Sequence, residues 1–212
     1  MTRIKDKGVA GESLRHHLRA ATMAAHDLLD HAMQAASGWQ TRSDYARFLG
    51  LQHAARVPVE AWLAEHAPAD LRPPLQTPLI ARDLSALGTG LPPASPPFDP
   101  GYTPSSPPLA GVFHVKHSAL GVAWVLAGSA LGNAAIGRQV KRIGDGVWPM
   151  AFLGDAAMMA FWQGLRARIE GEPASPAEAA GATQAAEAVF AHFLGVADGG
   201  QVPERQAEST QS

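Results

Sequence analysis

The chain has 212 residues and a formal net charge of −2, from 17 basic and 19 acidic residues, and it contains no cysteine. Disulfides, thiolate-bound metals and iron–sulfur clusters are therefore excluded, and the even spread of charge offers no basic surface to nucleic acid. No period of about 20–50 residues repeats, so the length predicts one domain. The charged residues 1–18 lack the apolar core of a signal peptide, which predicts a cytoplasmic protein.

Two helices are predicted in the first third of the chain. Apolar residues recur at helical spacing over residues 13–36, with Ser13 as the N-cap and Gly38 as the stop. A second helix is expected to begin near residue 41 or 43 and to bend at Pro58. The expected apolar stripe of the first helix consists of Leu14, Leu18, Ala21, Ala25, Leu28 and Ala32.

A short helix and a long loop are predicted next. Residues 77–88 combine Thr77 as a cap, Pro78 at the first helical position and Gly88 just past the end. Residues 89–108 are rich in proline, which predicts a surface loop without regular structure that interrupts the domain without dividing it.

The second half of the chain is apolar and helical in pattern. Long segments are expected at residues 111–143 and 147–170, followed by an alanine-rich helix at 176–194. Asp155 is predicted to be a helix-end or hydrogen-bonded structural residue. No stretch shows the alternation of a strand, so the prediction is a single all-α domain over residues 1–199, with residues 200–212 as a disordered polar tail.

A membrane span is the competing interpretation of residues 118–137, which carry no charge and contain a Gly-x-x-x-Gly pattern. Large apolar side chains, which drive insertion, are few in this stretch. The other helices are amphipathic and need a core partner, so a buried central helix is favoured and no membrane is expected.

Three glycines in this central segment need an explanation. Gly128, Gly132 and Gly137 lie within ten residues, and each glycine inside a helix costs about 1 kcal/mol relative to alanine. Their presence predicts that something approaches the helix backbone closely.

The nine histidines form no zinc-protease motif, and no carboxylate-rich triplet surrounds any of them, so a mononuclear zinc or iron enzyme is not indicated. His26 differs because it shares a helical stripe with Thr22, Leu29 and Met33, which directs its ring to the domain interior at an edge. A hydrogen-bonded core histidine and a metal ligand both remain open for this position.

Three segments resemble the heme oxygenase family. LRAATMAAHDLLD at residues 18–30 is similar to the first-helix signature of that family, and ALGVAWVLAGSALGNAAIGRQV at 119–140 is similar to its glycine-rich distal segment. DLSALG at 83–88 resembles the short helix between them. The matches in the first signature are Leu18, Arg19, Ala21, Thr22, His26 and Asp30.

The resemblance implies a multi-helical sandwich in which a flat heme lies between the first helix and a buried, glycine-rich, kinked distal helix. His26 would be the axial iron ligand. The residues implied to act in catalysis are Gly128, Gly132 and Asn133: the two glycines would let the distal backbone approach the open face of the porphyrin, and Asn133 would either hydrogen-bond distal water or bound oxygen or crowd the slot. The remaining residues implied to bind the heme, the basic ones through its propionates, are Arg19, Thr22, Ser129, Arg138 and Lys141.

The implied activity is oxidative cleavage of heme to biliverdin, carbon monoxide and ferrous iron, with O2 and electrons from an external reductase or ferredoxin. A functional link to a photoreceptor that uses the bilin product is also implied. The chain departs from the family pattern at Trp124, Ala127, Asn133 and Ala134. These departures keep two alternatives open: a noncatalytic heme-binding or heme-sensing protein with the same fold, and a helical membrane or interaction protein.

Overall fold

The computed structural model describes residues 13–101, 111–171 and 174–199, and in these ranges it contains α-helices and one short 3-10 helix but no strand. The prediction of an all-α fold is therefore confirmed for the described residues. The predicted tail at 200–212 and the end of the predicted loop at 102–108 lie outside them. The elements are α1 (Leu14–Ala36), α2 (Arg42–His66), η1 (Ala69–Leu71), α3 (Thr77–Ala86), α4 (Gly111–Ile143), α5 (Ala156–Glu170) and α6 (Pro176–Gly199).

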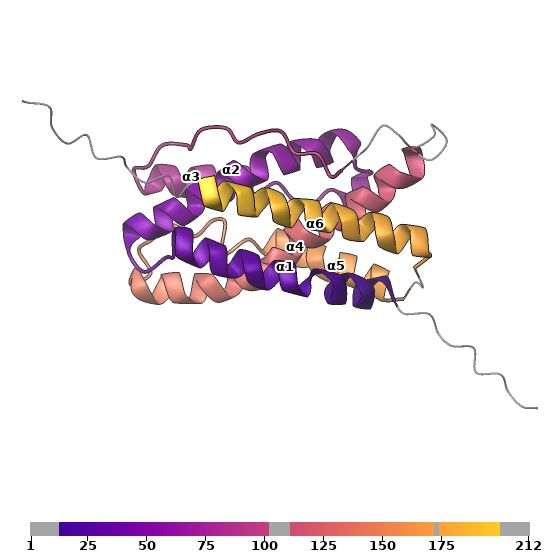
Figure 1. Cartoon of the computed structure of the whole chain (residues 1–212). Helices are drawn as coiled ribbons and strands as arrows, with labels where there is room; N and C mark the ends of the chain where they lie inside the picture. Colours follow the sequence, from indigo (N-terminus) through magenta and orange to yellow (C-terminus); the bar gives the residue numbers. More distant parts are fainter. Residues whose placement is uncertain (1–12, 102–110, 172–173, 200–212) are drawn as a thin grey trace, which may run out of the picture.

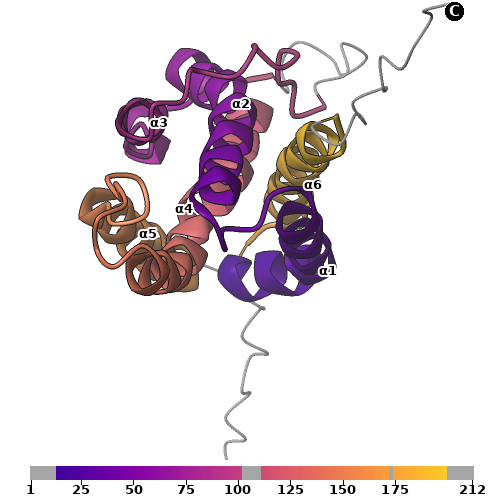
Figure 2. The ribbon, with the colours of Figure 1, turned by 90° about the vertical axis from the view of Figure 1, so that its left-hand side faces the viewer.

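Helix α4 is the centre of the arrangement. It packs against α6, α5 and α2, and α6 also packs closely against α1 (Figure 1). In the end view, α1 and α6 lie on one side of the molecule, with α3 and α5 on the other (Figure 2). Helices α1 and α4 are not among the closely contacting pairs of the described elements, so α6 and α5 hold them together across an intervening space.

The membrane interpretation applies to α4 alone among the described helices. Residues Lys116–Ile143 are long and apolar enough to cross a bilayer, with a mean hydropathy of 1.6. In the structure 56% of the most apolar window is buried, and the partners that bury it are other helices of the same chain. Packing against these helices accounts for the buried share of the window.

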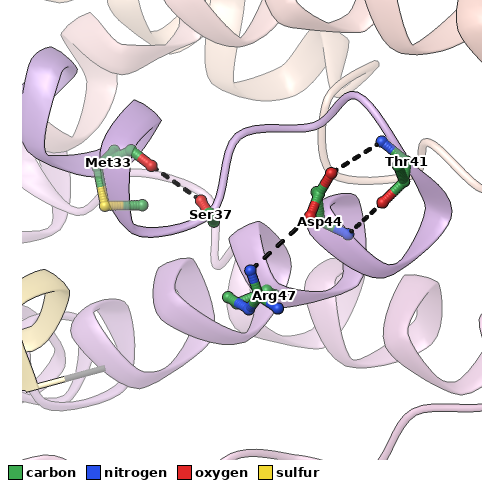
Figure 3. A network of polar contacts seen from close by, with 5 residues as sticks. All are labelled: Met33, Ser37, Thr41, Asp44 and Arg47. Carbon is green, nitrogen blue, oxygen red and sulfur yellow. Dashed lines mark hydrogen bonds and ion pairs between the residues drawn. The ribbon is translucent and has the colours of Figure 1, made fainter. Parts of the chain in front are cut away.

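Local hydrogen bonds stabilise the connection between α1 and α2 (Figure 3). The Ser37 hydroxyl donates to the Met33 carbonyl at 2.9 Å, and Gly38 follows with a left-handed φ of 61°, which suits glycine at a helix end. Thr41 and Asp44 form a reciprocal capping box at 3.1 Å in both directions, and Arg47 pairs with Asp44. The predicted starts at Ser13 and near residue 41 are both confirmed.

The cap of α3 differs from the prediction. Thr77 is the first helical residue and Gln76 holds the cap position without a capping side chain. The Glu60 carboxylate of α2 takes over this role by accepting hydrogen bonds from the Gln76 N–H at 2.9 Å, the Thr77 N–H at 3.3 Å and the Thr77 hydroxyl at 2.7 Å. A negative charge at a helix N-terminus is favourable, and here it comes from a distant part of the chain.

The buried face of α1 also differs from the predicted stripe. Leu14 and Leu18 are buried as expected, but the stripe continues through Thr22 and Met33, whereas Leu28 is 58% exposed. Thr22 can be buried because its hydroxyl donates to the Leu18 carbonyl at 2.7 Å. In an alanine-rich helix several faces are apolar enough, so the packing partner decides which one is covered.

The predicted segment 147–170 becomes a helix only from Ala156 onward. Asp155 is its N-cap, accepting from the backbone N–H groups of Ala157 and Met158, and it also accepts from the Gln76 side chain at 2.8 Å. The prediction of a structural role for Asp155 is confirmed. The described part of the proline-rich loop, residues 89–101, has no regular structure, but Phe98 is buried.

Gly121 explains how α4 and α6 approach so closely. A Cβ atom at this position would lie 2.0 Å from the carbonyl oxygen of Ala182 on α6. We expect Gly121→Ala to lower the free energy of unfolding by about 1–3 kcal/mol, because two helix backbones must move apart. Urea unfolding measures this loss. Gly164→Ala on α5, where an added Cβ meets nothing within 4 Å, is the control, and equal stability of the two variants would contradict the close approach.

Candidate functional site

A cavity of about 780 Å³ lies between α1 and α4, with α2, α5 and α6 completing its walls. Its volume falls in the range of roughly 300–1,000 Å³ typical of small-molecule sites. Residues from two distant segments of the chain therefore face one space. The predicted site residues that line it are Arg19, Thr22, His26, Gly128, Ser129, Gly132 and Asn133.

His26 lies on the α1 wall with its side chain 57% exposed, so it occupies the rim of the cavity rather than the domain interior. Its Nδ1 is 3.5 Å from Asp30 Oδ2 and 3.7 Å from Asp27 Oδ1. A carboxylate near one ring nitrogen favours the other nitrogen as a metal ligand. The Phe190 and His26 rings are in a T-shaped arrangement with a centroid distance of 6.4 Å.

The α4 wall is made partly of bare backbone. Gly128 and Gly132 are four residues apart and so lie on one face of α4. A Cβ atom at Gly132 would meet nothing within 4 Å, and one at Gly128 would meet only the Trp162 ring at 3.6 Å. Gly137, in contrast, lies against Leu153, which an added Cβ would contact at 3.4 Å. Protein packing accounts for Gly137 but leaves Gly132 without a structural reason among the described residues.

Three of the predicted residues that line the cavity differ in the hydrogen-bonding groups that they offer to a ligand. Thr22 is buried and its hydroxyl is engaged by its own helix, so it presents little polar surface. The Ser129 hydroxyl donates to the Leu126 carbonyl at 2.7 Å and accepts from Arg56. Asn133 is buried beside Gly132 and adds an amide to the α4 wall.

The positive charge around the cavity differs in part from the prediction. Arg19 lines it as expected, together with Arg15 and Arg166, whereas Arg138 and Lys141 are exposed and do not line it. Helical geometry explains this correction, because Arg138 lies about 120° and Lys141 about 180° around α4 from Gly132. Arg15 pairs with Glu170, while Arg19 has no ion pair among the described residues.

Arg56 was not among the predicted site residues. It lines the cavity from α2, is only 1% exposed, and donates to Gln52 Oε1 at 3.2 Å and to Ser129 Oγ at 2.8 Å. Burial lowers the pKa of Arg56 to about 10, although the Glu60 charge opposes this shift. The sequence did contain a signal, because Gln52, Arg56 and Glu60 form a polar stripe at four-residue steps along a helix, and the residues next to Arg56 and Glu60 are apolar.

Trp162 was also not among the predicted site residues. The centroid of its ring lies 4.8 Å from that of the Trp124 ring, and both residues line the cavity. The buried Nε1 of Trp162 and the buried Nη1 of Arg56 have no hydrogen-bond partner in the described part of the chain. Both atoms are donors, so the site has more donors than the protein itself satisfies.

Searches with the chain found neither a matching protein-family model nor a matching curated protein. Within the described residues no three or more metal-binding side chains cluster together. A site with several protein ligands is therefore not formed there, whereas heme iron can be held by one histidine.

Proposed function

We propose that this chain binds heme in the cavity between α1 and α4 and cleaves it oxidatively. The observation that carries the proposal is the pairing across one cavity of His26 on α1 with bare backbone at Gly132 on α4. Glycine at position 132 costs the helix about 1 kcal/mol relative to alanine, and a ligand that occupies the space beside it would compensate for this cost. A flat ligand held by an imidazole on one side fits this pairing.

The residues present are suited to heme in three respects. The Asp30 carboxylate beside Nδ1 of His26 leaves Nε2 as the atom to hold iron. Arg19 is an exposed basic side chain that lines the cavity and suits a propionate. Trp124, Trp162 and Phe190 supply apolar surface for the ring.

The protein's contribution to the reaction would be binding, orientation and shielding. Bound heme supplies the iron and is also the substrate, and O2 and electrons from a reductase or ferredoxin complete the conversion to biliverdin, carbon monoxide and ferrous iron. Gly128 and Gly132 keep the α4 side open for a small molecule, since any side chain there would enter the cavity.

A noncatalytic heme-binding protein is the second candidate. Asn133 supports it, because this buried amide lies in the cavity at the position where the family resemblance has a second glycine. An extra side chain on the α4 wall narrows the space that the reaction would need.

Hemin titration followed by reduction under air tests both candidates. A heme oxygenase is expected to give a saturable Soret band that decays to the spectrum of biliverdin when a reductase or ascorbate supplies electrons. A stable Soret band without bilin would identify the noncatalytic candidate. Absence of any saturable spectral change would contradict both.

A further inference from the structure

The guanidinium of Arg56 is a buried cation without a matching anion. No carboxylate lies within ion-pair distance of it in the described ranges. Glu60, one turn further along α2, is occupied in capping α3. Burying a charge without a partner is expensive, so its retention beside a cavity needs a reason beyond packing.

The surroundings of Arg56 fix its position on the α4 side of the cavity. The guanidinium carbon lies 5.2 Å from the Phe152 ring centre and 5.9 Å from that of Phe193. Its Nη2 donates to the hydroxyl of Ser129, which directly follows Gly128 on α4. Nη1 has no partner among the described residues. Nε and Nη2 of Arg56 are thus engaged by Gln52 and Ser129, while the buried Nη1 lacks an acceptor in the part of the chain that the structure describes.

Carboxylates at the edge of a bound heme do not explain this arginine. Arg15, Arg19 and Arg166 already line the cavity, and Arg19 is exposed, which suits carboxylates that remain partly hydrated. Arg56 is enclosed by aromatic rings and by α4. A small acceptor that enters on the α4 side matches such an enclosed donor better.

We propose that Arg56 donates a hydrogen bond to a small electronegative ligand bound on the α4 side of the heme, opposite His26, with Ser129 as the residue that positions the guanidinium. This inference rests on the proposed heme site. According to this inference, Arg56 of α2 makes the α4 side of the heme selective for anionic ligands. With a pKa of about 10, Arg56 is protonated throughout the neutral range.

Fluoride binding to the hemin-loaded full chain tests the proposal without requiring turnover. Hemin affinity is measured first, and fluoride affinity is then measured on loaded protein by absorbance. We expect Arg56→Met to bind hemin within about threefold of the unchanged protein and to bind fluoride roughly 10- to 100-fold more weakly, as expected for loss of a charge-assisted hydrogen bond. Arg56→Lys keeps the charge and is expected to lie between the two.

The remaining variants separate the outcomes. Arg138→Met, which removes an exposed arginine of α4 outside the cavity, is the matched control and should leave fluoride affinity unchanged. Failure of the unchanged protein to bind hemin would remove the proposed function itself. If Arg56→Met bound hemin normally and its fluoride affinity were unchanged, the inference would be overturned and the proposed function would stand. The same holds if Arg56→Met lost hemin affinity but its hemin-loaded fraction bound fluoride as tightly as the unchanged protein.

Should Arg56→Met fail to fold, Arg56→Lys and Ser129→Ala decide the question. Ser129→Ala removes the acceptor that orients Arg56 and is expected to weaken fluoride binding at least about threefold. Unchanged fluoride affinity in both variants would overturn the proposal.

Discussion

His26→Ala is expected to abolish the defined Soret band of hemin-loaded protein, because the His26 imidazole is the proposed protein ligand of the iron. The loss should exceed the roughly 10- to 100-fold effect that removal of an outer-shell partner of a metal ligand produces. Hemin titration by absorbance, with the protein's far-ultraviolet circular dichroism as a check on folding, measures it. The half-exposed side chain of His26 makes few packing contacts that the substitution would remove.

His31 provides the matched control for this experiment. It lies on the same helix and also lines the cavity, but its Nδ1 contacts the Asp27 carbonyl at 2.6 Å. His31→Ala should retain the Soret band. If the band were lost in His31→Ala and kept in His26→Ala, the iron would be held from a different point of α1 and the proposed pairing with Gly132 would be wrong.

Gly132→Ala is expected to raise the stability of the ligand-free protein and to lower its affinity for hemin. An added Cβ meets no protein atom within 4 Å, so the substitution should gain about 0.5–1 kcal/mol from helix propensity. The melting temperature would rise by about 2–4 °C per kcal/mol for a domain of this size. Hemin affinity and bilin yield should both fall, because the methyl group enters the cavity.

Gly164→Ala separates these two effects. Gly164 is an exposed glycine inside α5 with equally open space around it, and it does not line the cavity. It should give the same gain in melting temperature with unchanged hemin affinity. If Gly132→Ala also left hemin affinity and bilin yield unchanged, the α4 wall would not be in contact with the ligand.

The sequence predicted the start of a helix correctly where the capping residue directly precedes that helix in the chain. Ser13 and the Thr41 box begin α1 and α2 because their side chains satisfy backbone N–H groups a few residues away. The cap of α3 was mispredicted because Glu60, which supplies it, is 17 residues from Thr77 in the chain. The face of α1 was mispredicted because alanine permits several faces to be buried.

For the candidate site, the sequence predicted one residue on each of two facing walls of the cavity, but not the distance between them. His26 and Gly132 were selected by separate motifs, and the structure brings both to one cavity. The basic residues Arg138 and Lys141 were misplaced because a linear motif does not state which side of α4 faces the cavity. Arg56 was missed because its importance depends on complete burial and on the absence of an anion nearby, and neither can be read from four-residue spacing.

The sequence by itself determined the all-helical class and the start of α1 and α2, because helical periodicity and capping act over a few residues. It also indicated a histidine and a glycine-rich helix whose chemistry suits the proposed heme site. Only the tertiary structure decided that α1 and α4 stand apart around a cavity, that Gly121 and Gly137 serve packing while Gly132 faces open space, and that Arg56 is enclosed. These features depend on which helices meet and at what distance, and that is set by the packing of the whole core.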